Sequence, residues 1–180
     1  MKKVLFILGQ LSDLDIEWFI KIGHKEQVPA GKTLIHEGQA IDTLYLVLDG
    51  ALTVSMRALG DQEIARLGAG EMVGEMSFID ARPPSATVTA AENTFVLAVP
   101  RRQLAAKLEQ DPGFAARFYR ALATFLSDRL RGTVSRLGYG QGQSLETEID
   151  YADELDENVL DTVHLAGARF ERILKQLIGG

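Results

Sequence analysis

The chain has 180 residues, of which 46% are hydrophobic and 24% are charged, so it can bury the core of one domain and carry additional segments. It contains no cysteine, which excludes disulfides, thiolate metal ligands and cysteine nucleophiles and fits a cytoplasmic location. The net charge of −6 disfavours broad contact with a phosphate backbone, so we expect no nucleic-acid partner.

The N-terminus imitates the start of a signal peptide, because lysines precede the apolar run Val4–Leu8. That run is shorter than the roughly 7–15 apolar residues of a signal sequence and the about 20 of a membrane helix. We therefore interpret it as a core-packing segment and expect no membrane partner. Residues 13–22 follow as a short helix that Ser12 or Asp13 can cap.

From Glu26 to Pro100, short β-rich runs alternate with turn residues about every 8–12 positions, which is typical of an all-β sandwich or barrel. Asp49-Gly50 lies between two alternating runs and predicts a tight hairpin. The expected strands are Thr33–His36, Thr43–Leu48, Ala51–Met56, Glu63–Leu67, Ser85–Thr89 and Thr94–Val99.

After Pro100 the hydrophobic period becomes helical. Residues 101–110 predict a short amphipathic helix, and Asp111-Pro112 begins a longer one that runs to about Leu137. Apolar residues follow one drifting face of the longer helix, and we expect a homodimer to form through residues 113–137. This face carries Phe114, Phe118, Leu122, Phe125, Leu126, Leu130, Val134 and Leu137.

The C-terminal part consists of a linker at 138–158, glycine-rich and then acidic, and an amphipathic helix at 159–180 with apolar residues spaced by three and four. Two interpretations of the helix stay open. It either packs on its own protein, which we favour because so long an apolar stripe needs burial, or it binds a protein partner. The segment after Leu137 is too short and too acidic for a winged helix-turn-helix, so we expect no DNA-binding domain.

The segment Leu67–Val88 carries the most information about function. Gly74-Glu75 precedes a short turn of helix, Met76–Asp80, between two expected strands. A helix start presents unpaired N–H groups and attracts anions, phosphate especially, while Glu75 could accept a hydrogen bond from a sugar hydroxyl. Taken alone, such a Gly-Glu pair is usually just an ordinary turn and helix cap.

The same segment resembles the phosphate-binding cassette of the cyclic nucleotide-binding domain family, which includes the catabolite activator protein and the regulatory subunits of cAMP-dependent protein kinase. The family pattern is Phe-Gly-Glu-(Leu/Met)-(Ala/Ser)-Leu, a few residues, then Pro-Arg-(Ser/Ala)-Ala-Thr-Val. The chain matches this pattern without gaps at Gly74, Glu75, Met76, Ser77, Pro83, Ser85, Ala86, Thr87 and Val88.

The resemblance covers roughly residues 5–135 and implies a mainly β fold. This is a jelly-roll β-roll with a flanking N-terminal helix, a long C-terminal helix and here an extra terminal helix. We therefore assign residues 1–137 to the domain, 138–158 to the linker and 159–180 to the last helix. By resemblance, Glu75 accepts the ribose 2′-hydroxyl and the helix after Pro112 covers the base. The residues implied to line the phosphate and sugar are Gly74, Met76, Ser77, Ser85 and Ala86.

The chain departs from the family pattern at the position that binds the phosphate. Pro84 stands where the family has its phosphate-binding arginine, and proline offers neither a side-chain donor nor a backbone N–H. Losing one charge-assisted hydrogen bond costs about 1.5–3 kcal/mol, or roughly 10- to 150-fold in affinity. Arg82 either turns inward to replace it or stays solvated. Both residues are kept among the ligand-binding candidates, with cAMP or cGMP as the implied ligand.

No residues that could carry catalysis are visible. There is no Ser-His-Asp order, kinase motif set or P-loop, and His24, His36 and His164 are not spaced as metal ligands. We therefore expect a regulatory signalling module that senses a cyclic nucleotide or related ligand, not an enzyme. The alternative is a degenerate, ligand-free β-roll that serves as a structural, interaction or assembly domain.

Overall fold

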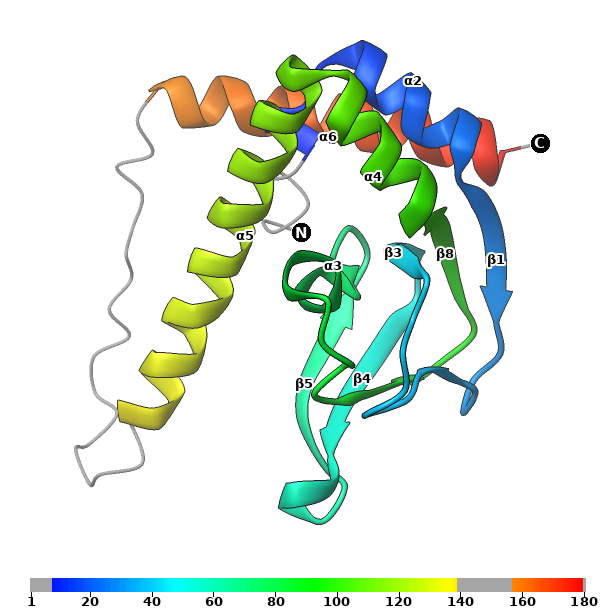
Figure 1. The fold of residues 1–180 in the computed structure, drawn as a ribbon, viewed down its shortest axis with the longest axis vertical. Coiled ribbons are helices and arrows are strands. Elements are labelled where there is room, and N and C mark those ends of the chain that lie inside the picture. The colour runs from blue at the N-terminus through cyan, green and yellow to red at the C-terminus, as the bar shows by residue number, and fades with distance from the viewer. Residues whose placement is uncertain (1–7, 139–156, 180) are drawn as a thin grey trace.

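The computed structural model describes residues 8–138 and 157–179. Two four-stranded antiparallel sheets form a β-roll with helices on one side (Figure 1). The first sheet has the order β1 (His24–Val28), β8 (Thr94–Pro100), β3 (Thr43–Asp49) and β6 (Met72–Val73). The second has the order β2 (Thr33–Ile35), β7 (Thr87–Ala90), β4 (Ala51–Met56) and β5 (Gln62–Gly68).

This architecture confirms the jelly-roll β-roll flanked by helices. Each of the expected β-rich runs contains a strand, and a short 3₁₀ turn, Arg57–Leu59, separates β4 from β5. Two strands were not expected from the sequence. β1 is a polar edge strand in which only Val28 is buried, so it has no clear apolar alternation. β6 is only two residues long.

The two central strands of the first sheet, β3 and β8, are apolar on both faces because each face is covered. On β3, Val47 points toward the second sheet, whereas Leu46 and Leu48 point toward the helices. β8 divides in the same way, with Val96 inside the roll and Leu97 outside it. This explains why β3 and β8 read as nearly continuous apolar runs. The core between the sheets consists of Val28, Ile35, Val47, Leu52, Leu67, Val73, Val88, Ala90 and Val96.

Four longer helices accompany the first sheet: α2 (Asp13–Ile22), α4 (Arg101–Gln110), α5 (Pro112–Gly138) and α6 (Glu157–Leu177). An ion pair ties α2 to α5, since Arg117 donates to the Asp15 carboxylate at 2.7 and 2.9 Å. Burial alone would raise the pKa of Asp15, but hydrogen bonds from Arg117 and Ser12 lower it. This partly buried pair helps to fix where α5 leaves the helical layer.

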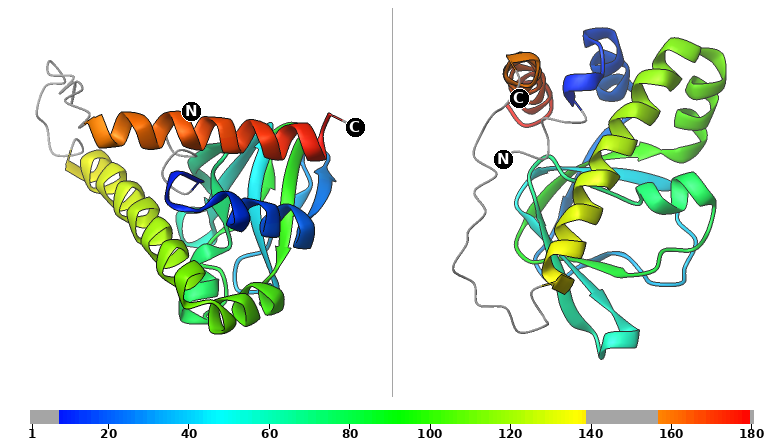
Figure 2. Two further views of the ribbon diagram at one scale, coloured as in Figure 1. Left: turned by 90° about the horizontal axis from the view of Figure 1, so that it is seen from above. Right: turned by 90° about the vertical axis from the view of Figure 1, so that its left-hand side faces the viewer.

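The C-terminal helix packs on its own chain, which agrees with the first of the two interpretations. Figure 2 shows α6 running beside α2. Ala166 and Ile173 of α6 are fully buried, and Arg169 donates to Asp13 at 2.7 Å. The linker at 138–158 lies outside the described residues except at its ends, as do residues 4–7 of the N-terminal run.

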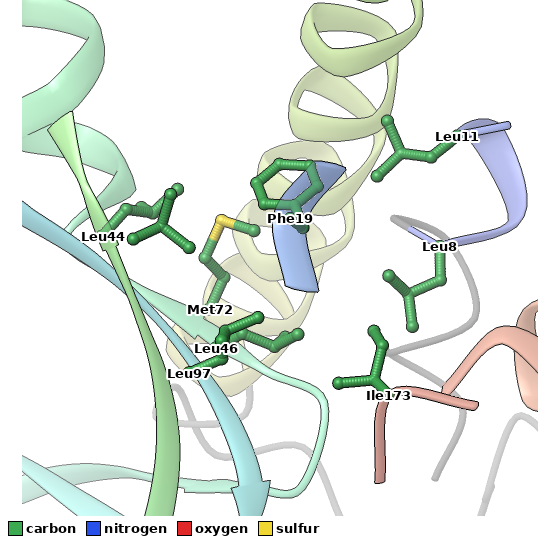
Figure 3. A pocket seen from close by; sticks show the side chains of 9 residues that line it. Leu8, Leu11, Phe19, Leu44, Leu46, Met72, Leu97 and Ile173 are labelled. Carbon is green, nitrogen blue, oxygen red and sulfur yellow. The ribbon is translucent and has the colours of Figure 1, made fainter. Parts of the chain in front are cut away.

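A small cavity remains between the first sheet and the helices (Figure 3), with Ile173 and Leu8 on one side and Leu46 and Leu97 on the other. Its volume is about 20 Å³ and its lining is entirely apolar. A space of that size holds at most one water, and no polar group is there to bind it. It is therefore a packing gap rather than a ligand site.

The long helix α5 has two apolar faces instead of one drifting face. The buried face carries Phe114, Phe118, Ala121, Leu122 and Phe125, and it packs in the core under the helices. The exposed apolar face lies roughly opposite, with Tyr119 50% exposed, Leu130 64% and Val134 58%. A dimer formed through this helix would therefore have to use the exposed face, because the phenylalanines already pack within the domain.

Candidate functional site

The predicted cassette connects the two sheets. It leaves β6 of the first sheet through Gly74, forms the short helix α3 (Glu75–Asp80) and enters β7 of the second sheet after Ala86. Gly74 has φ of +88°, and a Cβ there would lie 3.1 Å from the carbonyl oxygen of Thr43. Only glycine adopts this conformation without strain in so little space. The turn that aims Glu75 thus depends on Gly74.

Glu75 is the most deeply buried charged group of the cassette, with 2% of its surface exposed. Its Oε1 accepts a hydrogen bond from Nη1 of Arg129, on α5, at 2.6 Å. Nη2 of the same guanidinium donates to the Met72 carbonyl oxygen at 3.2 Å, and the group lies over the Phe125 ring. Burial raises the pKa of the Glu75 carboxyl, and the charge of Arg129 offsets this only in part.

The other α3 residues face different surroundings. Met76 is exposed, whereas Ser77 is buried. The Ser77 carbonyl oxygen accepts a hydrogen bond from Nη2 of Arg101 at 2.6 Å, and Nη1 of Arg101 donates to the Ile41 carbonyl at 2.7 Å. This arginine thereby clamps α3 to the loop before β3, which keeps the start of the cassette in place.

The second half of the cassette lies nearer the surface. The Arg82 side chain is 83% exposed and pairs with Asp80 at 3.8 Å, so it stays solvated instead of turning inward. The Pro84 carbonyl oxygen accepts a hydrogen bond from the Gly38 backbone N–H at 2.8 Å, which joins this loop to the turn after β2. Ser85 is exposed and Ala86 is half-buried.

Arg129 is the residue of the site that sequence reasoning missed. The resemblance implied that the helix after Pro112 covers the base, but it assigned no side chain of that helix to the site. A signal was present, since Phe118, Leu122, Phe125 and Arg129 are spaced by four, three and four, which places a charge on the buried face of the helix. A cation at such a position needs a buried partner, and Glu75 is that partner.

An open groove lies beside the cassette, between α3, α4 and α5. Its volume is about 480 Å³, and its lining includes Phe78, Ile79, Arg101 and Tyr119. None of the predicted ligand-binding residues lines it. Across residues 8–138 and 157–179, no group of three His, Cys, Asp or Glu side chains gathers as a metal site would require, and no helix is long and apolar enough to cross a membrane.

Comparison with known proteins gives a consistent result. The family model of the cyclic nucleotide-binding domain matches residues 25–111. The cyclic AMP receptor protein of Thermus thermophilus is 32% identical over 142 residues, which are 78% of this chain and 62% of that protein. The chain therefore spans less than two thirds of the length of that relative.

Two solved structures have the same fold. A cyclic nucleotide-binding domain from Methylobacillus flagellatus has a TM-score of 0.70 and 26% identity, over 80% of this chain and 85% of that one. The N-terminal domain of a transcriptional regulator from Streptomyces coelicolor has a TM-score of 0.59 and 30% identity, over 76% of this chain and 95% of that one.

Proposed function

Because the chain belongs to the cyclic nucleotide-binding domain family, we propose that it is a regulatory module that senses cAMP or cGMP through the cassette at Gly74–Ala86. The observation that carries this proposal is the position of Glu75. Its carboxylate is buried at the start of α3, directly after Gly74, whose positive φ sets the turn, and its cation partner comes from a separate helix. Such a partner can be exchanged for a ligand hydroxyl.

In this proposal, Glu75 accepts the ribose 2′-hydroxyl. Gly74, Met76, Ser77, Ser85 and Ala86 contribute backbone and hydroxyl groups around the sugar and phosphate, and α5 covers the base. Pro84 supplies no donor to the phosphate, and Arg82 is directed to solvent. The role is one of binding and signalling without catalysis. Binding energy that differs between two positions of α5 would provide the signal.

Calorimetric titration of the full chain with cAMP, cGMP and 2′-deoxy-cAMP tests this function. We expect saturable binding of at least one cyclic nucleotide, with the ligand recovered unchanged. The 2′-deoxy analogue should bind about 10- to 150-fold more weakly, because it cannot donate a hydrogen bond to the Glu75 carboxylate. Glu75→Gln should weaken the natural ligand similarly.

Asp80→Asn is the matched control, since it removes a carboxylate from the exposed end of the same helix. It should leave the affinity within about threefold of the parent value. Flat titrations with every cyclic nucleotide at millimolar concentration would rule out the sensing role. An unchanged affinity in Glu75→Gln would instead mean that the ligand lies elsewhere.

A second function is favoured by a specific observation: the Glu75 carboxylate already has a cation partner, and Pro84 replaces the expected phosphate ligand. These features also suit a ligand-free β-roll whose Glu75–Arg129 pair is a permanent structural latch. In that case Glu75→Gln would lower the thermal midpoint while no cyclic nucleotide raises it, whereas a sensor is stabilised by its ligand.

We further propose a homodimer through helix 113–137, formed by the exposed apolar face of α5, which includes Leu130 and Val134. The double variant Leu130→Glu/Val134→Glu should be monomeric where the parent chain sediments as a dimer, because two charges would be buried without partners. Arg131→Glu, at an exposed position off this face, is the control and should stay dimeric. A parent chain that sediments as a monomer at high concentration would contradict the proposal.

A further inference from the structure

The Arg129 guanidinium is the cation that reaches the cassette from α5. Its side chain is 30% exposed, while that of Glu75 is 3% exposed, so one partner is accessible to solvent and the other is not. The guanidinium lies 4.5 Å from the centroid of the Phe125 ring. Within residues 8–138 and 157–179, the guanidinium makes one hydrogen bond to the carboxylate and one to a backbone carbonyl, and these two bonds leave other donors of the five-donor fork unused.

Two other arginines near the cassette are committed elsewhere. Arg101 donates hydrogen bonds from its two terminal nitrogens to the backbone carbonyls of Ser77 and Ile41, and these bonds hold α3 in place. Arg82 is directed to solvent beside Asp80. Of these three arginines, Arg129 on α5 is therefore the one best suited to meet a phosphate at the cassette.

We infer that Arg129 replaces the missing cassette arginine and binds the phosphate of the ligand, in exchange for its pair with Glu75. This inference rests on the proposed cyclic nucleotide function. The incoming ligand offers a hydroxyl to Glu75 and an anion to Arg129, so that each group gains a new partner as it loses the old one. The hydroxyl is needed because Glu75 is deeply buried and an unpartnered buried charge is costly, and the anion draws the partly exposed Arg129 away from Glu75.

The exchange defines the ligand class. A nucleoside without phosphate would offer no anion to Arg129. A phosphate without a ribose hydroxyl would offer no hydrogen-bond donor to the Glu75 carboxylate. A ribonucleoside cyclic phosphate satisfies both groups at once. The exchange also makes α5 respond to the ligand, since Arg129 belongs to α5 and its pair with Glu75 joins that helix to the cassette.

The test compares Arg129→Gln and Arg129→Lys with the parent chain, using calorimetric titration with cAMP and with adenosine. Arg129→Gln should weaken cAMP binding by about 10- to 150-fold, the value of one charge-assisted contact. Arg129→Lys keeps the charge without the planar fork, so its affinity for cAMP should lie between those of the parent chain and Arg129→Gln. Arg131→Gln, which removes an exposed arginine from the same helix, should change the affinity less than about threefold.

The ratio of cAMP to adenosine affinity guards against a folding artefact, because partial unfolding of a variant lowers both affinities together. This ratio should fall in Arg129→Gln. If cAMP binds Arg129→Gln as well as or better than the parent, Arg129 competes with the ligand for the Glu75 carboxylate and does not bind the phosphate. That result overturns the inference but leaves the cassette as the nucleotide site. If neither chain binds cAMP or cGMP, the proposed function fails and the inference fails with it.

Discussion

Replacing Phe118 by alanine should lower the free energy of unfolding by about 3–5 kcal/mol. The ring is fully buried, and its centroid lies 6.3 Å from that of Phe19 on α2, 6.0 Å from Phe78 on α3 and 5.8 Å from Phe114 on α5. Its neighbours come from three separate elements that the rest of the fold holds in place. They cannot all move inward to refill the space, so the variant keeps most of its cavity.

Denaturation by urea measures this loss, with Tyr119→Ala as the control. Tyr119 is the next residue of α5 and is half-exposed, so its removal should cost less than about 1.5 kcal/mol. Phe118 is also one of the contacts between α3 and α5, since its ring and the Phe78 ring meet edge to face. Equal losses in the two variants would mean that α5 does not pack against the cassette helix as described.

Gly50→Ala should lower the free energy of unfolding by about 2–5 kcal/mol, the sum of backbone strain and overpacking. Gly50 joins β3 to β4 with φ of +88°, and a Cβ there would lie 2.8 Å from the Asn93 carbonyl oxygen and the Thr94 Cα. These are backbone atoms. The Thr94 hydroxyl is moreover hydrogen-bonded to both backbone groups of Ala51, so the strand end cannot shift without breaking bonds.

Gly31→Ala separates the two contributions. Gly31 has φ of +81° and no atom within 4 Å of the added Cβ, so its substitution introduces backbone strain alone, about 1–2 kcal/mol. Thermal or urea unfolding of both variants gives the difference. The same loss in Gly50→Ala as in Gly31→Ala would show that the β3–β4 hairpin relaxes freely around the new methyl group.

The sequence could predict those parts of the fold that are encoded locally. Alternating runs separated by glycine turns placed the strands around Asp49-Gly50, and the change to a helical period after Pro100 placed α4 and α5. β1 could not be predicted in this way, because an edge strand that buries only Val28 carries no alternation. β6 has two residues, too few for any period.

The candidate site was predictable as a segment but not as an arrangement. Gly74 and Glu75 belong to a continuous motif, so the resemblance could point to them. The pair between Glu75 and Arg129 joins residues 54 positions apart, and it depends on the direction in which α5 leaves the helical layer. That direction follows from the Asp15–Arg117 ion pair and the packing of the phenylalanines, which no local pattern encodes.

The division of α5 into two faces has the same cause. The apolar residues from Phe114 to Val134 form what looks like one drifting stripe, because a helical period alone does not show which side another element will cover. The domain takes Phe114, Phe118 and Phe125 for its own core and leaves Leu130 and Val134 exposed. The homodimer thus stays a prediction that rests on fewer residues than the sequence offered for it.

Nuclear magnetic resonance of the ¹⁵N-labelled full chain during titration with cAMP and cGMP is the most direct test of a ligand at the cassette. Saturable shifts should be concentrated at the backbone amides of Gly74 to Ser77, together with a shift of the Arg129 Nε–H signal as it leaves Glu75. Spectra in which these signals stay in place at millimolar concentrations of both nucleotides would contradict cyclic nucleotide binding by this protein.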